Sequence, residues 1–296
     1  MKKITLLFLL VASSNILLAQ LSLLEISQLE DKQFFKNTFL SSPMLEDFRQ
    51  GVKKGEVTKE ELKLERIGLI TFFQAENEIN KEKAQAFSYG YKTKSANTII
   101  NEIFAQSIAP MKAALKEKGT TLLLPNEFIE GEAAQSKYNQ VLGQIKTLNG
   151  KKEPIYEMES TTSYRSTPEG IDYVGVWLDN GQNQEVLNLL ATLAKEINVD
   201  GFLMVRNTTQ FYGFSEALGS ILLQIYIPHP EPNPKKEIYG YQLGQLEFVP
   251  DAPTGFIGIK KDEVSGEDYS AFPNLLSRCG ADFINFLNSE KSELFK

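Results

Sequence analysis

The sequence offers few of the side chains that most hydrolytic and metal sites require. It contains one histidine, His229, and one cysteine, Cys279. These counts exclude an intramolecular disulfide, a Cys/His zinc cage and any chemistry that needs two histidines from this chain. Ser215 lies in a Gly-Phe-Ser-Glu-Ala segment, which has only the first glycine of a nucleophile elbow. The one base for it is His229, which lies in a proline-rich segment, so we do not expect serine catalysis.

Carboxylates are plentiful, with 38 Asp and Glu residues in a chain of 296. Asp172, Asp179 and Asp200 come at the ends of predicted strands or helices, where loops could bring them together as a catalytic acid pair. Asp179 in Asp-Asn-Gly and Asp200 before Gly201 are also typical of turns. An envelope hydrolase that uses these loop carboxylates is therefore one alternative for the function.

Three residues that are close in the sequence form a candidate ligand surface. Tyr173 and Trp177 lie in a predicted strand, and Asp179 follows in the turn. Trp177 has apolar neighbours in this strand, which favours core packing for its side chain. A small-molecule binding protein that uses Tyr173, Trp177 and Asp179 is a second alternative.

Charge and loop patterns argue against two further classes of protein. Lys and Arg number 31 against 38 acidic residues, which gives a net charge of −7 and disfavours a nucleic-acid partner. The phosphate-binding patterns GxGxxG and GxxxxGK are absent, which disfavours a nucleotide-dependent enzyme. We expect no cofactor and no resident metal.

The first twenty residues have the pattern of a secretion signal. Lys2 and Lys3 precede a mostly apolar segment at 4–10, and Ala19 offers the small residue at which a signal peptidase cuts. Polar residues at 13–15 interrupt the apolar run, which is shorter than the roughly 20 residues of a spanning helix. No cysteine lies at the cleavage point. We expect an exported protein, periplasmic or extracellular, with neither a lipid anchor nor a transmembrane anchor after cleavage.

After the signal at 1–19, the pattern predicts a helical N-terminal extension at 20–64 and an α/β domain at 65–296. In the first half of the domain, a strand at 67–73, a helix at 98–118 and a strand at 122–124 predict a crossover unit. Residues 127–170 are polar and weakly patterned, and are predicted to be an insertion that holds a helix at 132–147 and a loop at 160–167.

The second half of the domain adds strands and two amphipathic helices. A tight helix-to-strand join is predicted at Gly201, and Cys279 is predicted to lie on the packed side of the last helix. The fold class is therefore α/β (α+β), a mixed sheet flanked by helices. The predicted strands are 173–178, 202–206, 221–227, 237–243, 246–249 and 255–259, and the predicted helices are 186–197 and 272–294.

Several segments together resemble periplasmic α/β domains of the CsgG-like and TolB N-terminal-like group. They are Glu65-Arg-Ile-Gly-Leu-Ile-Thr-Phe72, the helix end before Gly119 with the following Leu122 strand, and the Leu193 to Val205 helix–strand unit. In that group a hairpin carries the next two strands, which here corresponds to 221–227 and 236–241. The resemblance implies binding or assembly work in the cell envelope and carries over no catalytic residue.

The predicted function is that of an exported, non-catalytic envelope protein that acts by protein–protein contact in an accessory or assembly role. We expect its partner to be another envelope protein or a second copy of the chain. This prediction depends on the export signal, on the missing catalytic and metal constellations, and on the resemblance.

Overall fold

The computed structural model describes residues 22–42, 62–80, 89–148, 155–157, 161–178, 181–212, 215–250, 254–260, 263–265 and 271–294. It confirms the predicted fold class, because a mixed sheet is flanked by helices on both faces and short helices lie near the N-terminus.

One large sheet organises the molecule. Its strands are β1 (Thr38–Ser41), β2 (Arg66–Asn80), β3 (Thr121–Leu123), β4 (Ile155–Glu157), β5 (Thr161–Ser166), β8 (Gly201–Tyr212), β9 (Ser215–Asn233), β10 (Ile238–Phe248), β11 (Thr254–Lys260) and β12 (Glu263–Ser265). Their order is β1-β10-β9-β8-β2-β5-β4. In addition, β3 pairs with β2, and β11 pairs with β9. β2 runs parallel to β3 and β8, and the other pairs are antiparallel.

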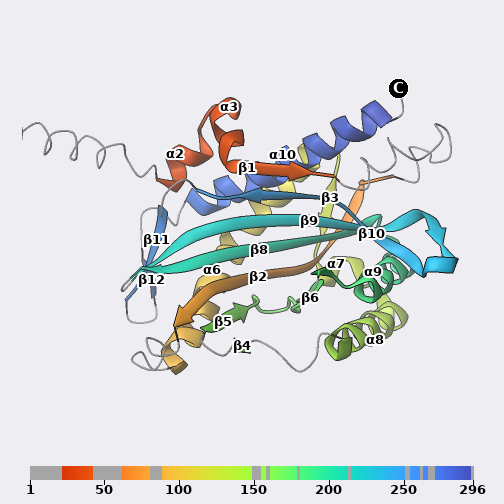
Figure 1. Cartoon of the computed structure of the whole chain (residues 1–296), viewed down its shortest axis with the longest axis horizontal. Coiled ribbons are helices and arrows are strands. Elements are labelled where there is room, and N and C mark those ends of the chain that lie inside the picture. The colour runs from red at the N-terminus through yellow and green to blue at the C-terminus, as the bar shows by residue number, and fades with distance from the viewer. Residues whose placement is uncertain are drawn as a thin grey trace, which may run out of the picture.

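Helices cover the two faces of this sheet in two separate layers (Figure 1). One face, called the α10 face, packs against α2 (Leu23–Ser27), α3 (Asp31–Phe34), α6 (Tyr89–Glu117) and α10 (Phe272–Leu294). The other, called the α9 face, packs against α7 (Pro125–Phe128), α8 (Gly131–Leu148) and α9 (Gln184–Glu196). The alternation of side chains along each strand supplies both cores, because successive residues point to opposite faces.

Two glycines have the backbone roles that the sequence predicted. Gly119 follows α6 with a φ of +83°, the left-handed conformation that closes a helix before the parallel strand β3. A Cβ at Gly201 would lie 2.5 Å from the Tyr226 carbonyl oxygen and 2.8 Å from the Ile227 side chain. The join between α9 and β8 is therefore as tight as predicted.

Three local predictions are wrong, two of them because of long-range strand pairing. Residues 38–41, predicted to be helical, form strand β1 at the sheet edge, while 43–61 lie outside the described part. The predicted loop at 160–167 contains β5, which pairs with the second half of β2. Only Trp177–Leu178 of the predicted 173–178 strand is a strand, β6, which pairs with β7 (Gly181–Gln182). The partners of β1 and β5 lie far away in the sequence, whereas β6 pairs with the strand that follows it directly.

Candidate interaction site

Residues 22–42 form an N-terminal arm that crosses the α10 face and ends at the sheet edge (Figure 1). α2 begins with a capping box, in which the Glu25 carboxylate accepts the Ser22 N–H at 2.8 Å and the Ser22 hydroxyl accepts the Glu25 N–H at 3.2 Å. The backbone hydrogen bond from Ser22 is the main reason that the pKa of Glu25 is lowered. Leu23, Ile26 and Phe34 are buried in the core, so the arm is an integral part of the fold.

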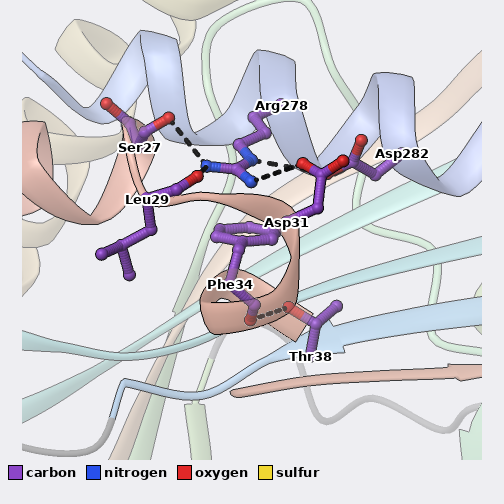
Figure 2. A network of polar contacts seen from close by, with 7 residues as sticks. All are labelled: Ser27, Leu29, Asp31, Phe34, Thr38, Arg278 and Asp282. Carbon is purple, nitrogen blue, oxygen red and sulfur yellow. Dashed lines mark hydrogen bonds and ion pairs between the residues drawn. The ribbon is translucent and has the colours of Figure 1, made fainter. Parts of the chain in front are cut away.

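Arg278 in α10 holds the arm through its guanidinium group (Figure 2). The group donates hydrogen bonds to the carbonyl oxygens of Ser27, at 3.1 Å, and Leu29, and it pairs with Asp31 at 3.1 Å. Asp282, one turn later, lies 3.5 Å from Nε. We call these contacts the Arg278 clamp. Burial raises the pKa of Asp282, and the adjacent guanidinium opposes that shift.

An aromatic stack extends the clamp to the sheet. The Arg278 guanidinium carbon lies 3.9 Å from the centre of the Phe34 ring, which is a cation–π distance. Phe34 stacks on Phe248 of β10, with ring centres 5.2 Å apart and an interplanar angle of 9°. The Thr38 hydroxyl donates to the Phe34 carbonyl at 3.0 Å. These contacts fix the position at which β1 begins.

β1 is the last strand on this side of the sheet among the described residues. The Val249 N–H donates to the Asn37 carbonyl at 2.9 Å, and the same register continues through Phe39 and Ser41. In an antiparallel pair, only every second residue of a strand uses its main-chain N–H and C=O to bond to the partner strand. Leu40 therefore directs its main-chain N–H and C=O away from β10. Outward groups of this kind are a template for another strand.

Two apolar side chains are exposed beside this edge. Phe39 is 57% exposed and Val249 is 49% exposed. Phe39 lies opposite Glu247, and Val249 follows two residues later, so alternation places the three side chains on one face. Glu247 forms a partly exposed ion pair with Arg206 at 3.7 Å. We call Phe39, Val249 and the outward main chain of Leu40 the β1 edge surface.

The predicted ligand surface is only partly within the described residues. Tyr173 contacts Phe73 of β2 edge to face, with ring centres 5.1 Å apart. Trp177 lies in the short strand β6, but its side chain and the whole of Asp179 lie outside the described part. Tyr173 is therefore placed against the sheet, and its grouping with Trp177 and Asp179 stays a prediction.

The other two carboxylates of the predicted acid group have partners. The Asp200 carboxylate accepts the backbone N–H groups of Glu65 at 2.7 Å and Arg66 at 2.8 Å, which ties the start of β8 to the start of β2. Asp172 lies 3.4 Å from the ammonium group of Lys146 in α8. Both carboxylates therefore have a structural contact, and the structure does not bring Asp172 and Asp200 together as a pair in any of these contacts.

The nucleophile and base candidates do not form a pair. Ser215 opens β9, and His229 follows fourteen residues later in the same strand, so about 45 Å of extended chain separates them. The His229 ring packs edge to face on the Tyr241 ring, with ring centres 5.4 Å apart. Cys279 is fully buried in α10, and burial raises the pKa of its thiol. The predicted packed position of Cys279 is confirmed.

Among the described residues, no group of three or more His, Cys, Asp and Glu side chains is arranged to hold a metal ion. Within the same part of the chain, every helix is too short or too polar to span a bilayer. Comparisons with protein-family models, curated proteins and solved structures give no match to this chain. The resemblance to the CsgG-like and TolB N-terminal-like group therefore stays a prediction.

Sequence reasoning missed the β1 edge surface. Phe39 was included in the predicted helical extension, and Val249 was placed inside a predicted strand without any role. The available signal was the pair Thr38-Phe39, because β-branched and aromatic residues favour strands. Four residues are too few for that preference to outweigh the surrounding helical spacing.

Proposed function

We propose that this chain is an exported, non-catalytic protein of the cell envelope that acts by contact with another protein at the β1 edge surface. The observation that carries the proposal is the 57% exposure of Phe39 on a strand whose outward main chain faces away from β10. An exposed edge with an apolar side chain is a typical site of strand addition. The Arg278 clamp supports a contact role because it holds this edge in one position.

The proposed occupant is an extended segment of a different protein. Two copies of this chain, each with a net charge of −7, repel one another. β1 has only four residues, which suits a short extended segment better than the roughly 800 Å² per partner that a standard stable dimer interface buries. A segment with apolar side chains for Phe39 and Val249, carried by a protein that is not strongly acidic, fits the surface better than a second copy.

Export and the lack of catalysis rest on separate support. The N-terminal pattern of Lys2, Lys3 and Ala19 supports secretion. The contacts of Asp172, Asp200 and Cys279 support a non-catalytic role, because each group already serves the fold. An accessory or assembly role in the periplasm or outside the cell is consistent with both.

Site-specific photocrosslinking in intact cells tests the proposal. A photoreactive phenylalanine analogue replaces Phe39 in one strain and the exposed Gln135 of α8 in a control strain. We expect one discrete heteromeric product from position 39 and none from position 135. The captured protein, once purified, should bind the wild type and lose at least about tenfold in affinity for a Phe39→Ser, Val249→Ser double variant.

Three results would contradict the proposal. The first is equal crosslinking from positions 39 and 135, and the second is a product that contains only copies of this chain. The third is unchanged affinity of the purified partner for a double variant whose melting curve matches that of the wild type.

A further inference from the structure

The outer surface of the α9 face contains a groove between two antiparallel helices. The Lys137–Glu196 ion pair, at 3.0 Å, joins the first half of α8 to the end of α9. Beyond that pair a groove of about 600 Å³ opens between the helices, within the roughly 300–1,000 Å³ typical of ligand sites. It is lined by Gln140, Gly143, Gln144, Thr147, Leu148, Glu185, Asn188, Leu189 and Thr192.

Some polar groups of the groove already serve the fold. The Asn188 side chain donates to the Glu237 carbonyl at 2.6 Å and accepts the N–H groups of Tyr239 and Gly240. The hydroxyls of Thr147 and Thr192 donate to carbonyl oxygens of their own helices. These side chains define the walls, and their hydrogen-bonding capacity is largely used.

Three other side chains remain available to a ligand. Within the described part of the chain, no hydrogen bond or ion pair engages the side chains of Gln140, Gln144 or Glu185. The two glutamines lie one helical turn apart on α8, and Glu185 lies in the first turn of α9. Among the described residues that line the groove, Glu185 is the only one with a charged side chain. The groove therefore combines amide donors and acceptors on one wall with one negative charge on the other.

Gly143 keeps the middle of the groove open. A Cβ placed there would have no neighbouring heavy atom within 4 Å. Leu148, at the far end of α8, is 36% exposed and lines the groove together with Leu189 of α9. The apolar part of the groove thus lies at the same end as Glu185.

We propose that this groove binds a short, extended peptide segment that carries one basic side chain. From Gln140 to Leu148 the α8 wall is about 12 Å long, which matches roughly four extended residues. Gln140 and Gln144 pair with the peptide main chain, the stem of the basic residue packs on Leu148 and Leu189, and its charged end meets Glu185. The site is separate from the β1 edge surface and does not depend on it.

Capped tetrapeptides that each carry one Lys or Arg are the probes, and the same peptides with norleucine in place of the basic residue are their controls. Fluorescence anisotropy measures their binding to the full chain. We expect the basic peptides to bind, with affinity that falls as salt is raised, and Glu185→Gln to weaken them about tenfold. Glu132→Gln, which removes an exposed charge from the start of the same α8 wall, should leave binding unchanged.

Gly143→Gln supplies an independent steric test because position 143 lines the groove and has open space around an added Cβ. It should abolish peptide binding, whereas Gly143→Ala should retain most of it. The proposal is overturned if no basic peptide binds below 1 mM, or if norleucine peptides bind equally well. It also fails if folded Gly143→Gln binds like the wild type. Phe39→Ser should leave peptide binding unchanged, which separates this test from that of the β1 edge.

Discussion

The two faces of the sheet are covered in different ways. On the α10 face, two long helices and the N-terminal arm surround a continuous apolar core, and the Arg278 clamp supplies the main polar contacts between α10 and the arm. On the α9 face, shorter helices leave a surface groove. The comparison indicates that the covering of the first face holds the arm and β1 in one position, whereas the covering of the second leaves polar side chains exposed in a groove.

Buried polar groups show the same contrast. Beneath the covering of the α9 face, the Gln224 amide donates to Gln245 at 3.1 Å, and the Tyr226 hydroxyl donates to Gln224 at 2.8 Å. Gln242 donates to Gln245 at 3.2 Å. Such a network specifies one arrangement of β9 and β10 because any shift would leave amides without partners. On the α10 face, the Arg278 guanidinium group contributes specificity of this kind, beside the buried hydrogen bond from the Ser42 hydroxyl to the Leu243 carbonyl.

The largest expected effect comes from separating α9 from the sheet. A Cβ at Gly240 would overlap the Leu187 carbonyl, so Gly240→Val forces the helix away from β10. We expect the free energy of unfolding to fall by at least about 3 kcal/mol. Gly143→Ala, at an open position of α8, should instead be neutral or stabilising. Denaturant titration of both variants measures the difference, and a small loss for Gly240→Val would show that α9 is loosely attached.

Breaking the Arg278 clamp should lower the free energy of unfolding slightly less than Gly240→Val does, and it should affect the α10 face. Arg278→Met leaves the Ser27 and Leu29 carbonyls without their donor and the Asp282 carboxylate without its counter-charge. We expect a loss of about 2–4 kcal/mol. Limited proteolysis should cut the arm first, and Arg278→Lys should fall between Arg278→Met and the wild type. Cleavage that begins elsewhere would show that the clamp does not hold the arm.

A smaller loss is expected at the join between α9 and β8. Gly201→Val places side-chain atoms against the Tyr226 carbonyl and the Ile227 side chain. We expect a loss of about 1–3 kcal/mol, which lowers the melting temperature by several degrees. Thermal unfolding followed by circular dichroism measures this change in melting temperature. An unchanged melting temperature would mean that the join is not tight.

The smallest effect concerns Lys291 at the end of α10. Burial lowers the pKa of its ammonium group from 10.5 to about 8, and Asp200 partly opposes the shift. Below pH 8 the ammonium group is charged in both the folded and the unfolded protein. The folded protein then bears the full free-energy cost of burying that charge. Between pH 8 and 10.5 the folded state loses its proton first, so stability rises with pH.

The difference between wild type and Lys291→Met isolates this contribution. We expect the wild type to gain about 1 kcal/mol relative to the variant between pH 8 and 10, after allowance for partial solvent exposure. The same measurement on Lys195→Met, which removes an exposed lysine elsewhere, is the control for the loss of a positive charge. A relative loss of wild-type stability over this range would contradict the inferred direction of the shift.

Sequence patterns predicted the helices and strands that are specified within their own segment of the chain. The last helix was predicted at 272–294 and is α10, and the crossover from β2 through α6 to β3 was predicted with its closing Gly119. The predicted hairpin is the β9–β10 pair, but the proline-rich segment, predicted to be its connection, lies mostly inside β9, which runs to Asn233. β1 and β5 could not be predicted in this way, because each becomes a strand by pairing with a distant element.

The candidate site was harder to predict than the fold. The exposure of Phe39 depends on a register with β10, about two hundred residues later, and the groove depends on how α8 and α9 pack. Neither relation leaves a periodic signal in one segment. The structure places Ser215 and His229 at separate points of β9, so these two residues do not form the pair that serine catalysis requires.

Amide hydrogen exchange at Leu40 tests the central claim most directly, since this N–H points away from β10. Exchange is followed by NMR in the isolated protein and after addition of the partner captured from position 39. We predict fast exchange at Leu40 alone, beside slow exchange at Phe39, and at least about tenfold slowing when the partner binds. Strong protection of Leu40 in the isolated protein, or no change on binding, would contradict a role for β1 as an open edge.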